Sequence, residues 1–172
     1  MSKLKKVFIP LVIIIAIPLI VALFVKKDYA IEESVIIDLP KSEVFGYIKY
    51  LKNQDHFSKW ASIDQNMEKT FHGTDGTVGF ISAWKSEHKD VGSGEQEIIH
   101  ITEDERIGYE LWFLKPVKAT NKAYMTTTTI DENQTEVKWG FNGKMTYPMN
   151  LMLIFMNFEK MISDDSQQDS IN

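Results

Sequence analysis

The chain has 172 residues, of which 44% are apolar, 12% aromatic and 25% charged, as expected for one globular domain with room for a short extra segment. It contains no cysteine, which excludes disulfide scaffolds, zinc–cysteine sites, iron–sulfur clusters and thiol nucleophiles. The first 27 positions hold five basic residues and no acid, and from Asp28 onward there are 14 basic and 24 acidic residues. An acidic domain of this kind lacks a basic surface for phosphates, so nucleic-acid partners are excluded.

The amino terminus, residues 1–27, is predicted to be a membrane anchor. Val7 to Val25 is a run of 19 residues without a charged or hydrogen-bonding side chain. As a helix it would be about 28 Å long, close to the hydrocarbon thickness of a bilayer, and lysines flank it on both sides. A cleaved signal peptide is the alternative, but the large Leu23 and Phe24 stand where a cleavage site needs small residues. We expect an uncleaved single-pass anchor, and the excess of lysines before the run favours an extracytoplasmic position for the rest of the chain.

Residues 28–162 are predicted to form one α+β domain. Alternating apolar residues predict a first strand over 31–39, and apolar residues at helical spacing predict a helix over 42–51 and a second short one around Trp60. Six further strands follow at hairpin spacing, namely Met67–His72, Val78–Lys85, Gly92–Thr102, Arg106–Leu114, Lys122–Ile130 and Glu136–Lys144. Consecutive strands with short turns predict an antiparallel sheet with one buried face.

The carboxy-terminal part is predicted to be a closing helix over Tyr147–Ile162. This segment is apolar nearly all round, so such a helix must be buried on several sides. Residues 163–172 are polar, and we expect them to form a disordered tail.

A series of short motifs in the predicted domain resembles one known superfamily. They are Leu39-Pro-Lys-Ser-Glu-Val-Phe45, Phe57-Ser-Lys-Trp-Ala61, Asp64-Gln-Asn-Met67, Gly76-Thr-Val-Gly79, Val91-Gly-Ser-Gly94, Glu105-Arg-Ile107, Lys115-Pro116 and Thr120-Asn121. In this order they resemble the START-like, or SRPBCC, superfamily with its helix-grip fold, and within it the membrane-anchored members of the polyketide cyclase/dehydrase branch. The resemblance covers residues 29–162.

The resemblance implies a curved seven-stranded antiparallel sheet wrapped around a carboxy-terminal helix, with an apolar cavity between them. Members bind lipids, hormones or polyketides, and some cyclise or hydrolyse their ligand. Two features depart from the pattern: the closing helix is short, which would leave the cavity less covered, and the run Thr126–Thr129 makes one wall more polar.

No catalytic or metal-binding arrangement stands out in the sequence. The four histidines lack the spacing of metal ligands, so we expect no metal and no cofactor. His56 is retained as a candidate acid or base, and His100 shares the parity of Ile98, which leaves an inward orientation open. Glu95, Glu97 and Glu110 are expected on the outer, solvated face of the sheet.

Aromatic and methionine side chains are the candidates for ligand binding. Methionine is flexible and suits walls that adapt to apolar ligands, although a fully packed core is the alternative for the same residues. The candidate binding residues are Trp60, Phe80, Trp84, Tyr109, Phe113, Thr127, Trp139, Met149, Met152 and Met156. In the predicted fold, those on the sheet face Met149–Met156 across the interior.

The expected function is that of a membrane-anchored domain that binds a hydrophobic small molecule or lipid between the sheet and the closing helix. Two alternatives stay open. One is an enzyme of the cyclase, dehydratase or hydrolase type, although no residues of the sequence form a recognisable catalytic set. The other is a packed interaction domain without a ligand.

Overall fold

The computed structural model describes residues 3–154, apart from the side chains of residues 3–7, 59 and 60. The chain divides into two compact units, residues 1–31 with 143–172, and residues 32–142, and each is described by itself. The predicted tail over 163–172 lies outside the described residues, as does the second half of the predicted closing helix, residues 155–162.

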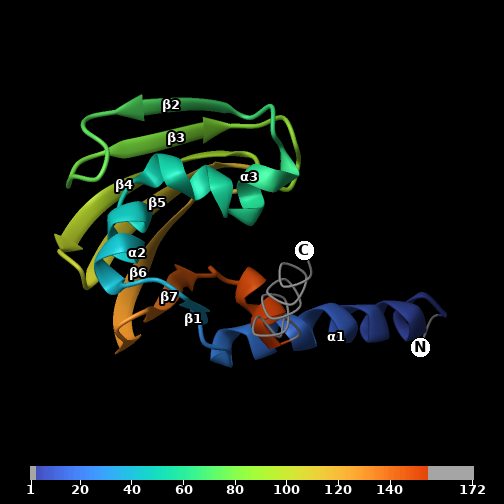
Figure 1. Cartoon of the computed structure of the whole chain (residues 1–172). Coiled ribbons are helices and arrows are strands. Elements are labelled where there is room, and N and C mark those ends of the chain that lie inside the picture. The colour runs from blue at the N-terminus through green and yellow to red at the C-terminus, as the bar shows by residue number, and fades with distance from the viewer. Residues whose placement is uncertain (1–2, 155–172) are drawn as a thin grey trace. The chain divides into compact units, whose positions relative to one another are not determined.

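The described elements follow the predicted order: a helix, a first strand, a group of short helices and then six consecutive strands (Figure 1). In chain order they are α1 (Lys3–Phe24), β1 (Asp28–Ile37), α2 (Lys41–Ile48), the 3-10 helix η1 (Leu51–His56), α3 (Lys59–Ile63), β2 (Glu68–His72), β3 (Ile81–Lys85), β4 (Ser93–Thr102), β5 (Arg106–Lys115), β6 (Ala119–Asp131), β7 (Gln134–Lys144) and the 3-10 helix η2 (Met149–Ile154).

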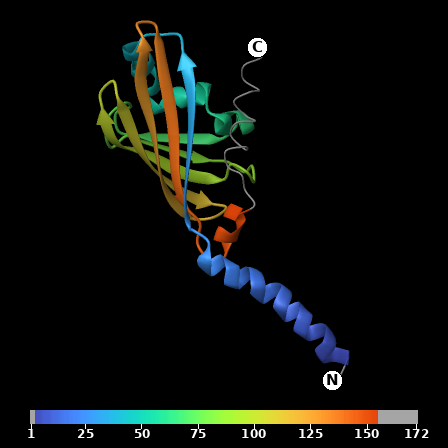
Figure 2. The same ribbon diagram turned by 90° about the horizontal axis from the view of Figure 1, so that it is seen from below.

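The strands form one seven-stranded sheet in the order β1-β7-β6-β5-β4-β3-β2. Each neighbouring pair from β2 to β7 is antiparallel, which confirms the predicted sheet. The sheet is curved, and α2, η1 and α3 lie within the curve on its concave side (Figures 1 and 2). The concave face is therefore the inner face of this unit.

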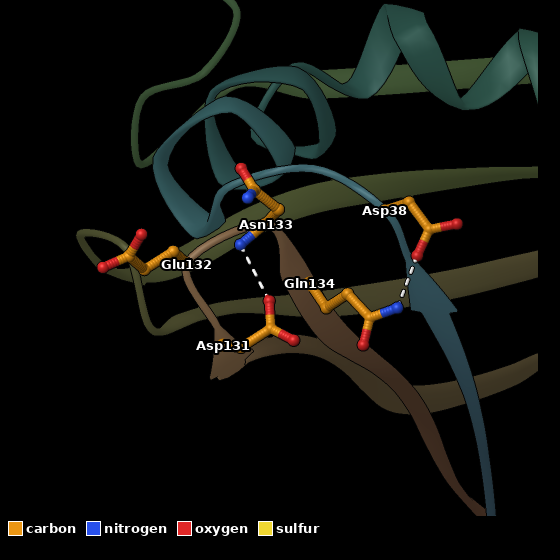
Figure 3. A pocket seen from close by; sticks show the side chains of 5 residues that line it. All are labelled: Asp38, Asp131, Glu132, Asn133 and Gln134. Carbon is orange, nitrogen blue, oxygen red and sulfur yellow. Dashed lines mark hydrogen bonds between the residues drawn. The ribbon is translucent and has the colours of Figure 1, made fainter.

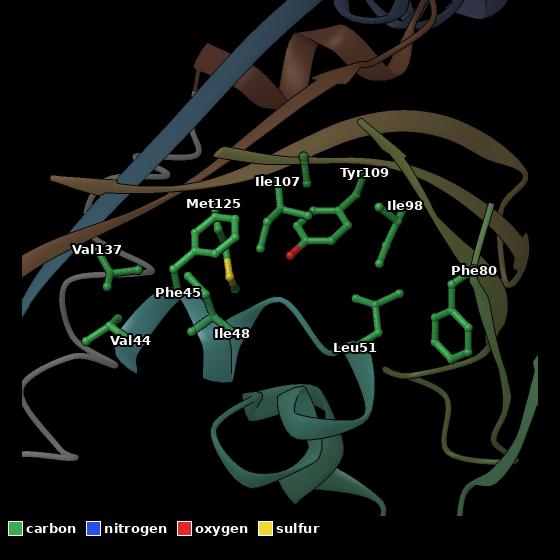
Figure 4. Close-up of a cluster of buried hydrophobic side chains, with 11 residues drawn as sticks. Val44, Phe45, Ile48, Leu51, Phe80, Ile98, Ile107, Tyr109, Met125 and Val137 are labelled. Carbon is green, nitrogen blue, oxygen red and sulfur yellow. The ribbon is translucent and has the colours of Figure 1, made fainter. Parts of the chain in front are cut away.

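The core of residues 32–142 lies between α2 and the concave face of the sheet (Figure 4). The apolar side of α2 and residues of alternating parity on the strands meet there, as periods of 3.6 and 2 require. The buried cluster consists of Val44, Phe45, Ile48, Leu51, Phe80, Ile98, Ile107, Tyr109, Ala123, Met125 and Val137. Each large apolar side chain buried in this way contributes roughly 1.5–3 kcal/mol to folding.

A register shift in β4 changes which side chains face inward. Ile98 pairs with Tyr109, but the next paired residue is His100, opposite Gly108, so Ile99 is an extra residue in the strand. Such a bulge reverses the alternation beyond it. His100 is consequently exposed, with its Nε2 3.0 Å from the Thr102 hydroxyl, and the inward orientation left open by parity is wrong.

Strand β3 begins three residues later than predicted, because its expected first residues form a turn. The Phe80 amide donates to the Thr77 carbonyl, and Gly79 has a φ of +88°, a conformation that favours glycine. In the turn just before it, the Asp75 carboxylate accepts from the Leu51 amide at 2.8 Å and ties the loop to the start of η1.

In the other unit, the predicted helix of the apolar run is present as α1, which includes Pro10 and Pro18. Asn150 of η2 closes its carboxyl end: its side-chain nitrogen donates to the carbonyl oxygens of Ala22, at 2.7 Å, and Val25, at 3.0 Å. Over the part of the chain that the structure describes, no helix has the combined length and hydropathy needed to cross a membrane. The single membrane pass stays a prediction.

The closing helix differs from the prediction over its described part. Instead of α-helix, Met149–Ile154 forms a 3-10 helix, in which the Leu151 amide donates to the carbonyl of Pro148 three residues earlier. The rest of the predicted helix, including Met156, lies outside the described residues.

Candidate functional site

Four aromatic side chains form a continuous row on the inner face of the sheet. We call Trp84, Phe113, Phe141 and Trp139 the aromatic row; they come from β3, β5 and β7. Ring centroids are 5.8 Å apart for Trp84 and Phe113, 6.4 Å for Phe113 and Phe141, and 5.9 Å for Phe141 and Trp139. The first two contacts are edge-to-face and the third is stacked, both of which are arrangements that aromatic rings prefer. All four side chains are only half-buried, in contrast to the core beside them.

Gly94 makes the contact between Trp84 and Phe113 possible. It lies between them in the sheet, paired with Trp84 on β3 and with Phe113 on β5. A Cβ atom at this position would lie 2.5 Å from the Trp84 ring and 2.5 Å from the carbonyl oxygen of Trp112. Only glycine leaves room for the ring there, and so the Trp84 side chain lies across β4.

The structure brings only some of the sequence-predicted site residues together. Trp84, Phe113 and Trp139 belong to the aromatic row, whereas Phe80 and Tyr109 are in the packed core with about 1% of their surface exposed. Thr127 is buried on the inner face, and its hydroxyl donates to the carbonyl of Asp104 at 2.8 Å. Met149 and Met152 are exposed in the other unit; Met156 and the Trp60 side chain lie outside the described part. Their ligand-binding role stays a prediction.

Tyr109 is a buried polar residue at the centre of the core. Its hydroxyl points towards η1 and the end of α2, and it has no hydrogen-bond partner there (Figure 4). Burial raises the pKa of the Tyr109 phenol well above its usual value. The nearby Gln54 side chain opposes this rise, but it does not complete a hydrogen bond to the hydroxyl.

The sequence reasoning missed two polar side chains on the inner face. Gln96 and Asn121 both pair with Leu111, on either side of it in the sheet, so all three point to the same face. The alternation of β4 could have revealed Gln96, because it lies two residues before the buried Ile98 and so points to the same face. Glu95, Glu97 and Glu110 have the opposite parity to Gln96 and Tyr109, which confirms their predicted outer position.

The histidine retained as a candidate acid or base lies on the surface. The Nδ1 atom of His56 is 2.7 Å from the hydroxyl of Tyr47, and the two rings stack with centroids 6.3 Å apart. Both side chains are exposed, with Tyr47 on α2 and His56 on η1. The contact between the two helices is sufficient to account for this pair, and it gives no support to an acid or base role for His56.

A serine, an aspartate and a histidine also meet near the end of β3, but not as a catalytic triad. The Ser86 hydroxyl donates to the Asp64 carboxylate and accepts from the backbone amide of His88. A nucleophilic serine instead donates to a histidine ring. The hydrogen bonds from Ser86 and from the Asn66 amide, together with His88, lower the pKa of the Asp64 carboxyl.

A polar hollow of about 640 Å³ lies at the β6–β7 turn (Figure 3). It is lined by Asp38, Asp131, Glu132, Asn133 and Gln134. The Asn133 amide donates to Asp131 at 2.8 Å, and the Gln134 side chain donates to Asp38 at 2.7 Å, so these groups satisfy one another. The described residues include no cluster of three or more metal-ligating side chains, here or elsewhere.

Comparison with known proteins places the fold. No family model and no curated protein matches the chain. Among solved structures, it resembles norcoclaurine synthase from Thalictrum flavum in complex with dopamine and hydroxybenzaldehyde, with a TM-score of 0.59 at 8% identity over 86% of this chain and 87% of the synthase. It also resembles the Mll3558 protein from Rhizobium loti (0.57, 11% identity, 82% and 91% covered) and Ara h 8.0201 (0.52, 12% identity, 83% and 90% covered).

The fold is of the helix-grip type. At these identities the similarity shows the fold alone. The polyketide cyclase/dehydrase branch stays a prediction, as does any ligand or reaction.

Proposed function

We propose that residues 32–142 bind an apolar small molecule on the aromatic row. The observation that carries the proposal is the row itself: four rings from three strands touch one another, and each keeps part of its surface exposed. Half-buried aromatic surface on a concave face gains free energy when a further apolar group covers it.

The chemistry of the inner face favours binding over a reaction. Its described side chains on β3 to β7, with Phe80 just before β3, are Phe80, Ser82, Trp84, Gln96, Ile98, Ile101, Ile107, Tyr109, Leu111, Phe113, Ala119, Asn121, Ala123, Met125, Thr127, Thr129, Thr135, Val137, Trp139 and Phe141. General acid–base catalysis requires a group that titrates near neutral pH, and none of these does so; burial moves the pKa of Tyr109 further away.

A solved structure with the same fold supports the class of ligand. The norcoclaurine synthase structure was determined with dopamine and hydroxybenzaldehyde, both small aromatic molecules. We extend this only to the proposal that a small ring-containing or otherwise apolar molecule binds here.

We further propose that α1 anchors the chain in a membrane. The 19 residues from Val7 to Val25 contain no charged side chain, and lysines flank them. Large apolar side chains on α1 from Phe8 to Phe24 are exposed, several by more than half of their surface, as in Ile14 and Leu23. Such a surface is far more apolar than soluble proteins expose, and lipid is the solvent that suits it.

The ligand proposal is tested by adding a ring to the site. Ala119 lies directly opposite Phe113 on the inner face, so Ala119→Phe extends the aromatic row into the space that a ligand would use. The control is Thr120→Phe, one residue further along β6, on the opposite face and exposed. Thr127 is less suitable, because its hydroxyl hydrogen bond would be lost.

The full chain in lipid nanodiscs is titrated with fatty acids, isoprenoids and aromatic polyketides, and tryptophan fluorescence reports binding. We expect saturable binding of at least one class to the wild type and to Thr120→Phe, and about tenfold weaker binding to Ala119→Phe. Equal binding to all three proteins would place the ligand elsewhere. No binding of any class would favour a packed domain without a ligand.

A further inference from the structure

Two carboxamide side chains stand beside the aromatic row on the inner face. Gln96 on β4 and Asn121 on β6 pair with Leu111 of the strand between them, so their Cα atoms are about 10 Å apart, two strand spacings. Phe113 of the aromatic row is two residues along β5 from Leu111, or about 7 Å. The amides and the rings therefore lie within the reach of one small molecule.

The two carboxamide side chains are partly or largely buried on the inner face. The Asn121 side chain keeps only 7% of its surface exposed, and that of Gln96 is half-buried. No hydrogen bond joins either carboxamide to another described residue, and neither is among the fully buried unpaired side-chain atoms, which are those of Tyr109 and Asn150, so the two amide groups remain accessible. An amide in this position offers both a donor and an acceptor to a bound molecule.

The residues of the inner face disfavour a charged ligand. None of the described inner-face side chains on β3 to β7 carries a charge. Lys69 of β2 pairs with Trp84 and so shares this face, but its ammonium group is bound to the Asp55 carboxylate. A carboxylate placed on the aromatic row would lose its hydration without gaining a free counter-charge.

We propose that the ligand is a neutral molecule with a flat apolar body and a carbonyl or hydroxyl group that hydrogen-bonds to Asn121 or Gln96. The inference rests on the proposed ligand site and narrows its substrate class: plain hydrocarbons leave the amides unpaired, and fatty acids bring a charge. Aromatic ketones, phenols and similar neutral oxygenated molecules satisfy both features.

Three probes of similar shape test this on the full chain in nanodiscs, by calorimetric titration with the heat of empty nanodiscs subtracted. 2-Acetonaphthone has a carbonyl, 2-ethylnaphthalene has no polar atom, and 2-naphthoate is ionised at pH 7. The variants are Asn121→Ala and Gln96→Met, which remove one carboxamide each, and the control is Asn142→Ala on the opposite, exposed face of β7. Circular dichroism checks that each variant is folded, and Gln96→Met nearly preserves side-chain volume.

We expect one of the two carboxamide variants to bind 2-acetonaphthone about fivefold more weakly, the effect of one lost hydrogen bond, with 2-ethylnaphthalene and Asn142→Ala unaffected. 2-Naphthoate should bind the wild type at least roughly tenfold more weakly than 2-acetonaphthone. Equal losses for both neutral probes, no loss in either variant, or tight binding of 2-naphthoate would overturn this inference and leave the aromatic-row site intact. If none of the three probes binds, this inference fails, and the titration with fatty acids, isoprenoids and aromatic polyketides decides whether the proposed site stands.

Discussion

The hydroxyl of Tyr109 is a polar group in an apolar environment. It is buried in the core and has no hydrogen-bond partner. This costs free energy, because the hydroxyl loses its hydrogen bonds to water and forms none in their place. The substitution Tyr109→Phe removes only this oxygen. We expect it to raise the free energy of unfolding by about 1 kcal/mol, measured by urea denaturation with tryptophan fluorescence.

Tyr124→Phe is the matched control for that prediction. The Tyr124 hydroxyl donates to the Glu32 carboxylate on the outer face, so its removal should lower the free energy of unfolding, by about 0.5 kcal/mol in this partly solvated position. A clear loss of stability in Tyr109→Phe would mean that a bound water or ligand pairs with the hydroxyl, contrary to the expectation.

Single residues also show what the sequence alone conceals. Parity correctly put Trp84, Phe113 and Trp139 on the inner face, because alternation follows directly from strand geometry. It did not separate the packed Tyr109 from the half-exposed row, since burial depends on which elements pack above each position. Gln96 and Asn121 do not stand out in the sequence, because a neutral amide belongs to no catalytic or metal-binding motif.

At the scale of elements, the predicted strands agree with the structure to within a few residues, and the larger differences have local causes. A turn with Gly79 in a left-handed conformation shortens β3, and the extra residue at Ile99 reverses the facing of His100. Both depend on backbone geometry that hydrophobic alternation does not encode. The described part of the closing helix is a 3-10 helix, which an apolar pattern over Tyr147–Ile162 does not distinguish from an α-helix.

The contact between α3 and the end of β3 should depend on pH. Asp64 follows α3, and its carboxylate accepts hydrogen bonds from Ser86 and from the Asn66 amide, which lower its pKa in the folded protein. A group with a lowered folded pKa stabilises the fold above its unfolded pKa, and the contribution disappears as pH falls through the folded value. The stabilisation is therefore complete near neutral pH and declines below about pH 4.

Urea denaturation of wild type, Asp64→Asn and Ser86→Ala from pH 7 to pH 3 measures this contribution. We expect Asp64→Asn to have a lower midpoint than the wild type at pH 7, and the difference should shrink below about pH 4 as the wild-type carboxyl is protonated. Ser86→Ala should show a smaller difference with the same pH dependence. A midpoint difference that stays constant down to pH 3 would indicate a packing effect instead of a titrating carboxylate.

For the whole molecule, the decisive question is whether α1 places the domain at a membrane. If Val7–Val25 is an uncleaved anchor, the full chain stays in the membrane fraction through carbonate and high-salt washes, because removing 19 apolar residues from lipid is very unfavourable. The matched control is a chain that begins at Asp28, which should leave the membrane fraction. Mature protein that starts near Asp28 would instead show a cleaved signal peptide.

Because the chain contains no cysteine, a single introduced thiol can show on which side of the membrane the domain lies. Glu132 lies in the exposed β6–β7 turn, so Glu132→Cys gives a single accessible thiol in an otherwise cysteine-free chain. We expect a membrane-impermeant maleimide to label this variant in intact cells, since the excess of lysines before the apolar run favours an extracytoplasmic domain. Labelling only after the cells are broken would place the aromatic row, and the ligand proposed for it, on the cytoplasmic side.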